Sequence, residues 1–172
     1  MNYYGSPEHN ARLQDWEKRI FSKCVFLEPT SEYRPNEKYL VKRWFLSDES
    51  TRRSDRSPDC GNFNRLYRND TFLFEWRYIG TEERDAQIIH HANGKDYLVY
   101  YEYLYGYSVL DLTTMKGVHY IPQESASFDD EHFDETFIWC QPYYDPASSL
   151  LAVDGCIWAA PYSVIVLDSA IR

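Results

Sequence analysis

The sequence lacks any apolar run long enough to cross a membrane. A membrane-spanning helix needs about 20 consecutive apolar residues, and no stretch of the 172 residues comes near that length. The first 16 residues, MNYYGSPEHNARLQDW, also lack the basic start and the apolar core of a secretory signal peptide. We therefore expect a cytoplasmic protein with no membrane partner.

Sequence motifs for several chemistries are missing as well. There is no Gly-x-Ser-x-Gly elbow, no glycine-rich phosphate loop and no Cys-x-x-Cys pair, which argues against a serine hydrolase, a nucleotide-binding loop and a common zinc site. Without an export signal, Cys24, Cys60, Cys140 and Cys156 are expected to be reduced thiols. Cys140 and Cys156 lie in apolar runs that predict core positions. A disulfide between these two is the alternative if the chain is exported by another route.

Positive charge is scarce in the second half of the chain. Residues 1–80 carry 14 Lys and Arg against 12 Asp and Glu, whereas residues 81–172 carry 4 against 15. The formal net charge of the whole chain is −9. Because phosphate binding needs clustered positive charge, this distribution argues against a nucleic-acid partner. An acidic surface would instead attract a basic protein.

Aromatic residues are abundant, at 17% of the chain with 16 Tyr and 5 Trp. Such residues favour β-strands, because they fit a pleated and half-buried surface. One helix is predicted over Asn10–Lys23, where Leu13, Trp16 and Ile20 recur at helical spacing and Asn10 is a candidate N-cap.

The remaining segments read as strands and turns. Lys38–Leu46 predicts a strand between a connection at Thr30–Asn36 and a long polar loop at Ser47–Gly61. Hairpin turns are predicted at Asn69-Asp70, Asn93-Gly94 and Gly106. Further strands are expected at Asn62–Arg68, Thr71–Ile79, Ala86–His91, Tyr97–Leu104, Tyr107–Leu112, Val118–Ile121, Thr136–Tyr144, Leu150–Val153 and Ser163–Leu167.

An internal repeat organises this pattern. Asp96–Leu112 and Leu150–Asp168 both contain a strand, a turn, and a Tyr-Ser-Val segment that ends in Asp. The sequence therefore predicts a mainly β fold of repeated antiparallel β-meanders with one N-terminal helix. We expect a single domain, with the helix and an extension at residues 1–37 and the meanders at 38–172. The last meander lacks a fourth strand, which Lys38–Leu46 or another N-terminal segment would supply.

Two stretches, KDYLVYYEYLYGYSVLDLTTMKGVHYIP and TFIWCQPYYDPASSLLAVDGCIWAAPYSVIVLD, resemble β-propeller-type repeats. The resemblance covers about residues 62–168, and the second stretch is similar to the first three strands of a blade. In general look the chain resembles a small uncharacterised bacterial family with such repeats. A closed propeller has about four or more blades, so the resemblance implies propeller-blade-like sheets that are open or incomplete, or closed by homo-oligomerisation. A twisted sandwich is the alternative.

Exposed aromatic and acidic side chains are the candidates for binding. Successive tyrosines alternate between the two faces of a strand, so some of them reach a surface or lie between packed sheets. We predict binding through Tyr103, Tyr105, Trp139 and Trp158, because Tyr and Trp are enriched at interfaces. The acidic loop at 123–135 adds Asp129, Asp130 and Glu131.

Catalytic alternatives have less support. His90 and His91 point to opposite faces of a strand, and one of them could join His119 and Asp111 in a metal site. A thiol dyad of Cys156 with a histidine is not required by the spacing.

The leading hypothesis is a non-catalytic protein-interaction module, such as an immunity- or inhibitor-type protein, with no catalytic residue, metal or cofactor assigned. The alternatives are a hydrolase with a His/carboxylate site and a glycan-binding module.

Overall fold

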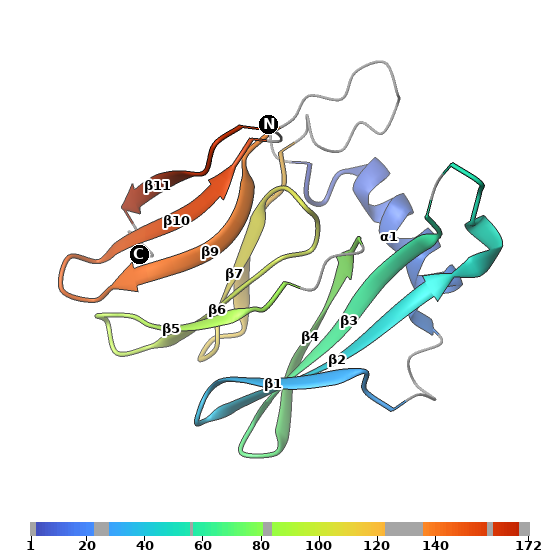
Figure 1. The fold of residues 1–172 in the computed structure, drawn as a ribbon. Helices are drawn as coiled ribbons and strands as arrows, with labels where there is room; N and C mark the ends of the chain where they lie inside the picture. The colour runs from blue at the N-terminus through green and yellow to red at the C-terminus, as the bar shows by residue number, and fades with distance from the viewer. Residues whose placement is uncertain are drawn as a thin grey trace. The chain divides into compact units, whose positions relative to one another are not determined.

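The computed structural model describes residues 3–22, 28–55, 57–80, 84–122, 136–157 and 160–168. The chain divides into two compact units. The N-terminal unit is Gly5–Glu83, and the C-terminal unit is Arg84–Arg172 together with Met1–Tyr4. The fold is mainly β, with one N-terminal helix and three antiparallel sheets (Figure 1). The predicted fold class is therefore confirmed, while the resemblance to propeller repeats stays a prediction.

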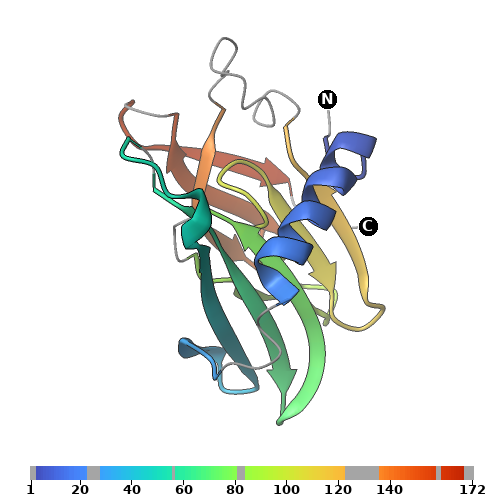
Figure 2. The same cartoon turned by 90° about the vertical axis from the view of Figure 1, so that its right-hand side faces the viewer.

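Helix α1 spans Pro7–Arg19, so it begins earlier than predicted. Ser6 is the N-cap in place of Asn10, because its hydroxyl accepts from the His9 amide and Pro7 occupies the first turn. Trp16 is buried on this helix, which is the blue coil in Figure 2. Among the described residues, no helix is long and apolar enough to cross a membrane.

The first sheet belongs to the N-terminal unit and has the strand order β1-β2-β3-β4. Its strands are β1 (Ser31–Asn36), β2 (Tyr39–Asp48), β3 (Asp59–Arg68) and β4 (Thr71–Ile79). The predicted hairpin is confirmed, with Asn69 and Asp70 at φ 49° and 63° in the turn.

Two predictions about the first sheet are wrong. The segment predicted as a connection is the edge strand β1, where Pro35 is tolerated because an edge strand has one unpaired side. The predicted loop Ser47–Gly61 is shorter, because both flanking strands extend into it and a 3-10 turn occupies Glu49–Thr51.

The second sheet lies in the C-terminal unit, with the order β5-β6-β7-β8. Its strands are β5 (Gln87–His90), β6 (Asp96–Tyr100), β7 (Tyr107–Asp111) and β8 (Lys116–Tyr120). Gly94 and Gly106 adopt positive φ at the predicted turns. The strand predicted to reach Leu104 ends at Tyr100, and Tyr105 instead forms an isolated bridge with Ile138.

The third sheet has the order β11-β10-β9 and completes the C-terminal unit. Its strands are β9 (Ile138–Asp145), β10 (Leu150–Cys156) and β11 (Ser163–Asp168). The expectation that Lys38–Leu46 supplies a fourth strand here is wrong, because β2 pairs with β1 and β3 in the first sheet.

Aromatic side chains connect the second and third sheets. The Tyr101 hydroxyl donates to the Cys140 carbonyl oxygen at 3.1 Å, and the rings of Tyr107 and Trp139 lie 4.0 Å apart. The Tyr144 hydroxyl accepts from the Ala92 amide at 3.1 Å. The two sheets of the C-terminal unit therefore share one aromatic core.

Candidate functional site: the outer face of the third sheet

The outer face of the third sheet carries a row of apolar side chains. Tyr143, Ala152 and Val166 lie directly opposite one another on the three adjacent strands. Val164 lies opposite Asp154 two residues further along, so its side chain is on the same face. We call Tyr143, Asp154, Tyr162, Val164 and Val166 the outer-face cluster.

The outer-face cluster is open to solvent. Tyr143 is 51% exposed, Tyr162 69%, Val164 64% and Val166 59%. The neighbouring positions on β10 point the other way, and Leu151 and Val153 are buried. This alternation leaves an apolar face in water, which is a feature typical of interaction surfaces.

A β-bulge positions the carboxylate at the centre of this cluster. The pairing register of β10 with β9 shifts between Val153 and Gly155. Two residues of β9, Cys140 and Gln141, therefore lie opposite the single residue Asp154. Asp154 accepts from the Gln141 amide at 2.7 Å and from the Tyr143 hydroxyl at 3.4 Å. Burial and the nearby Asp154 carboxylate raise the pKa of Tyr143. The ring of Tyr143 is thus tied to the sheet and presents a preset aromatic surface.

The strands of the third sheet carry carboxylates and no cationic side chain of their own, although the Arg84 guanidinium, from outside the sheet, donates to the Trp139 carbonyl oxygen of β9. Residues 136–168 contain no Lys, Arg or His, and their charged residues are Asp145, Asp154 and Asp168. Asp145 closes the β9–β10 turn by accepting from the amides of Ala147 and Ser148, and the Ser148 hydroxyl lowers the pKa of Asp145. This carboxylate is therefore ionised near neutral pH.

Cys140 and Cys156 are half-buried free thiols, not fully buried core residues. Cys140 Sγ lies 3.7 Å from the Tyr162 hydroxyl oxygen, which it contacts at the edge of the outer-face cluster. This contact raises the pKa of Tyr162. Cys140 therefore packs at the edge of the face, and the reduced state of the cysteines stays a prediction.

The residues predicted for binding have different positions. Tyr103, Tyr105 and Trp139 are buried, with exposed fractions of 7%, 5% and 7%. Trp158, Asp129, Asp130 and Glu131 lie outside the described residues. The binding role of all seven stays a prediction.

The outer-face cluster was not singled out from the sequence. Its signal was present in the segment SVIVLD, where both alternating faces are apolar although the strand lies at an edge.

A second polar cluster surrounds His119 in the C-terminal unit. His119 Nδ1 lies 2.9 Å from Ser108 Oγ and 3.1 Å from Glu102 Oε2, and the ring of Tyr4 stacks on the imidazole at 3.9 Å. In a catalytic triad the serine and the acid contact different ring nitrogens. Here both contact the same nitrogen, and Ser108 is buried. This geometry does not support nucleophilic catalysis.

The predicted histidine metal site also lacks geometric support. His90 pairs with Asp96 at 2.8 Å, whereas His91 is buried against the rings of Tyr97 and Tyr144. Over the described ranges, no group of three or more His, Cys, Asp or Glu side chains could hold a metal ion.

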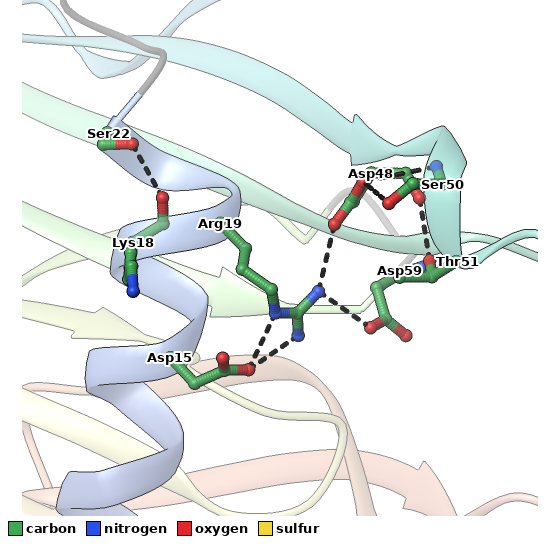
Figure 3. Close-up of polar contacts among 8 residues, drawn as sticks. All are labelled: Asp15, Lys18, Arg19, Ser22, Asp48, Ser50, Thr51 and Asp59. Atoms are coloured by element: carbon green, nitrogen blue, oxygen red, sulfur yellow. Dashed lines mark hydrogen bonds and ion pairs between the residues drawn. The ribbon is translucent and has the colours of Figure 1, made fainter.

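In the N-terminal unit, Arg19 joins the helix to the first sheet (Figure 3). Its guanidinium contacts Asp15 at 2.7 Å and both Asp48 and Asp59 at 3.2 Å. The bond to Asp15 is the main cause that raises the pKa of Arg19. Arg19 therefore fixes the end of α1 to the ends of β2 and β3.

A polar pocket of about 340 Å³ lies at this end of the sheet, lined by Ser50, Thr51, Arg52, Arg53 and Asp59. Its hydroxyls already have partners, because Ser50 Oγ donates to Asp48 and Thr51 Oγ1 donates to the Asp48 carbonyl oxygen. Arg52 pairs with Glu49 at 2.8 Å. We assign this region a structural role.

Comparison with known proteins gives no match to any protein-family model and no significant match to a curated protein. The function is therefore argued from the geometry and charge of the chain's own residues.

Proposed function

We propose that the chain is a non-catalytic protein-binding module that contacts a basic partner through the outer-face cluster. The observation that carries this proposal is the exposed row of Val164, Val166 and Tyr143 on a sheet whose own residues include carboxylates and no cation. Exposed β-branched and aromatic side chains would contribute apolar contact area, at about 1.5–3 kcal/mol for each side chain that becomes fully buried.

The charge of the C-terminal unit specifies the kind of partner. This unit contains 4 Lys and Arg against 13 Asp and Glu, a net charge of −9. A surface of one sign accelerates association with an oppositely charged protein and disfavours acidic competitors. An immunity- or inhibitor-type protein that covers a basic surface of its target is a concrete form of this function.

The proposal can be tested with a labelled peptide of alternating lysine and valine, followed by fluorescence anisotropy on the full chain. We expect binding that weakens as the salt concentration rises, because counterions screen the attraction. The matched peptide of alternating glutamate and valine should not bind.

Val166→Ser should weaken binding of the lysine–valine peptide about tenfold, the equivalent of losing about 1.4 kcal/mol. Val118→Ser is the matched control, because Val118 is an exposed valine of the same unit on strand β8. Equal loss in both variants, or equal binding of the two peptides, would show that the contact is unspecific and contradict the proposal.

A further inference from the structure

Strand β11 repeats β7 in sequence and in position. Each is the third strand of its meander and ends in Val-Leu-Asp, at residues 109–111 and 166–168. A Tyr-Ser pair stands at the start of both, with Tyr107 as the first residue of β7 and Tyr162 directly before β11. The two strands differ at their outer edges. Strand β8 pairs with β7 from Tyr107 to Asp111, whereas over the described ranges no strand pairs with the outer edge of β11 (Figure 1).

The open edge of β11 also lacks the usual protection against strand pairing. Edge strands are commonly blunted by proline, by lysine or by other charged side chains. Strand β1 has Glu32, Arg34 and Pro35 at its edge, in agreement with this rule. Strand β11, SVIVLD, has no proline and a single charged residue at its end. It is an edge suited to receive another strand.

We infer that β11 binds an extended segment of the partner protein as an antiparallel fourth strand, and that this segment resembles β8 in chemistry. The inference rests on the proposed function, because it specifies how the basic partner is held. Main-chain hydrogen bonds would supply affinity, and alternate side chains would supply specificity.

Strand β8 shows which side chains such a segment would carry. Lys116 lies opposite Asp111 and Val118 lies opposite Val109. When the Val-Leu-Asp ends of β7 and β11 are aligned, the same register sets a lysine opposite Asp168 and a β-branched residue opposite Val166. The lysine matches the acidic third sheet, and the β-branched residue extends the row of Tyr143, Ala152 and Val166 by one strand.

The charge argues for a different protein, not for a second copy of this chain. Pairing of β11 with β11 of another copy would join two sheets that have three aspartates each and no cation between residues 136 and 168. Like charges brought together across an interface oppose association. A basic strand removes this repulsion.

The test uses a labelled peptide of residues 113–121, TTMKGVHYI, added to the full chain, with amide hydrogen exchange measured by NMR. Successive amides of a strand point to opposite sides, so alternate amides of β11 face the open edge. We expect these amides to exchange rapidly in the free chain and at least tenfold more slowly with the peptide bound. The amides of β7 serve as the internal control and should not change.

Two peptide variants separate strand addition from other binding. A peptide with proline at the position of Val118 cannot continue the ladder, and a peptide with glutamate at the position of Lys116 reverses the charge. Both should bind at least tenfold more weakly.

Binding without new protection in β11, or protection in β7 instead, would overturn strand addition but leave the proposed function intact. If neither this peptide nor the lysine–valine peptide binds, both proposals fail. A dimer in the absence of peptide whose β11 amides are already protected would identify a second copy as the occupant and overturn the assignment to a basic partner.

Discussion

The two units build similar antiparallel meanders but differ in their charge: one is balanced and the other is strongly acidic. The N-terminal unit contains 14 Lys and Arg and 14 Asp and Glu, so its formal charge is zero. Its arginines connect carboxylates to aromatic rings, as Arg77 does between Glu17 and the face of Phe63. The C-terminal unit has a net charge of −9 and relies on tyrosine contacts and on aspartates that accept from turn amides.

This difference shows which unit has charge available for a partner. In the N-terminal unit several cations lie beside anions of the same unit, as in the contacts of Arg19 and Arg65, and the formal charges cancel. The 4 cations of the C-terminal unit cannot balance its 13 anions. The unbalanced anions repel one another within the unit, and a basic partner would relieve that repulsion. The comparison therefore favours the C-terminal unit as the binding unit.

The largest expected effect is that of Gly106→Ala on the C-terminal unit. Gly106 has φ +89°, and a Cβ there would overlap the Tyr120 carbonyl oxygen and approach Ile121 Cα to 2.9 Å. We expect a loss of about 3 kcal/mol in the free energy of unfolding, from overpacking and an unfavourable φ. Amide exchange of β6 to β8 would measure it, and the amides of the first sheet should keep their protection.

Gly94→Ala is the matched control for that substitution. Gly94 has a similar φ of +80°, but a Cβ there would meet nothing within 4 Å. Only the backbone strain remains, so we expect a loss of about 1 kcal/mol. Equal losses in the two variants would remove the steric argument, and an equal loss of protection in the first sheet would show that the two units do not unfold separately.

Arg19→Met should have a smaller effect, confined to the N-terminal unit. The substitution keeps most of the aliphatic stem and removes the guanidinium that lies among Asp15, Asp48 and Asp59. Because hydrogen bonds to charged groups contribute more than neutral ones, we expect a loss of about 2 kcal/mol. Urea unfolding followed by amide exchange of the first sheet would measure this loss.

Arg52→Met is the control for Arg19→Met. Arg52 and Glu49 form an ion pair in which both side chains are more than half exposed, and such pairs contribute little because water and salt screen them. We therefore expect the urea unfolding curve of the first sheet to stay within the error of the measurement. If the two arginine variants lose equal stability, the contacts of Arg19 do not anchor α1.

The sequence predicted the parts of the fold that depend on local chemistry. The turn residues Asn69-Asp70 and Asn93-Gly94 predicted hairpins, because these residues accept positive φ. The end of β6 was missed, because Tyr105 leaves its local pattern to pair with Ile138, 33 residues away. No local pattern contains that information.

The candidate site was harder to predict than the fold for the same reason. The tyrosines that looked most distinctive, Tyr103 and Tyr105, are buried in the structure. Tyr101 instead lies between the two packed sheets of the C-terminal unit, which was the other position expected for these tyrosines, and its hydroxyl donates to the third sheet. Exposure of Val164 and Val166 depends on which strands lie beside β11, and pairing of strands is a property of the whole sheet.

The smallest expected effect concerns Asp111 in the C-terminal unit. The Lys95 ammonium at 2.8 Å lowers the pKa of Asp111, and the amides of Thr113 and Thr114 add to this effect. A carboxyl whose pKa is lower in the folded state stabilises the fold above its unfolded pKa, and this contribution is lost as the pH falls through the folded pKa. The loss should therefore begin below pH about 4.

Asp111→Asn keeps an oxygen that can accept from the two amides and removes only the charge opposite Lys95. At neutral pH the melting temperature of the C-terminal unit should fall by no more than about 3 °C, because water reaches the 40% exposed Lys95 and an ion pair open to water on one side contributes little. Between pH 4 and pH 2 the variant should lose less stability than the unsubstituted chain, since it has no carboxyl to protonate at this turn.

Melting temperatures across this range, with Asp15→Asn as the equivalent change in the N-terminal unit, would measure both effects. If Asp111→Asn leaves the acid dependence unchanged, the turn aspartates do not carry the acid sensitivity of the C-terminal unit, and its net charge alone would have to explain it.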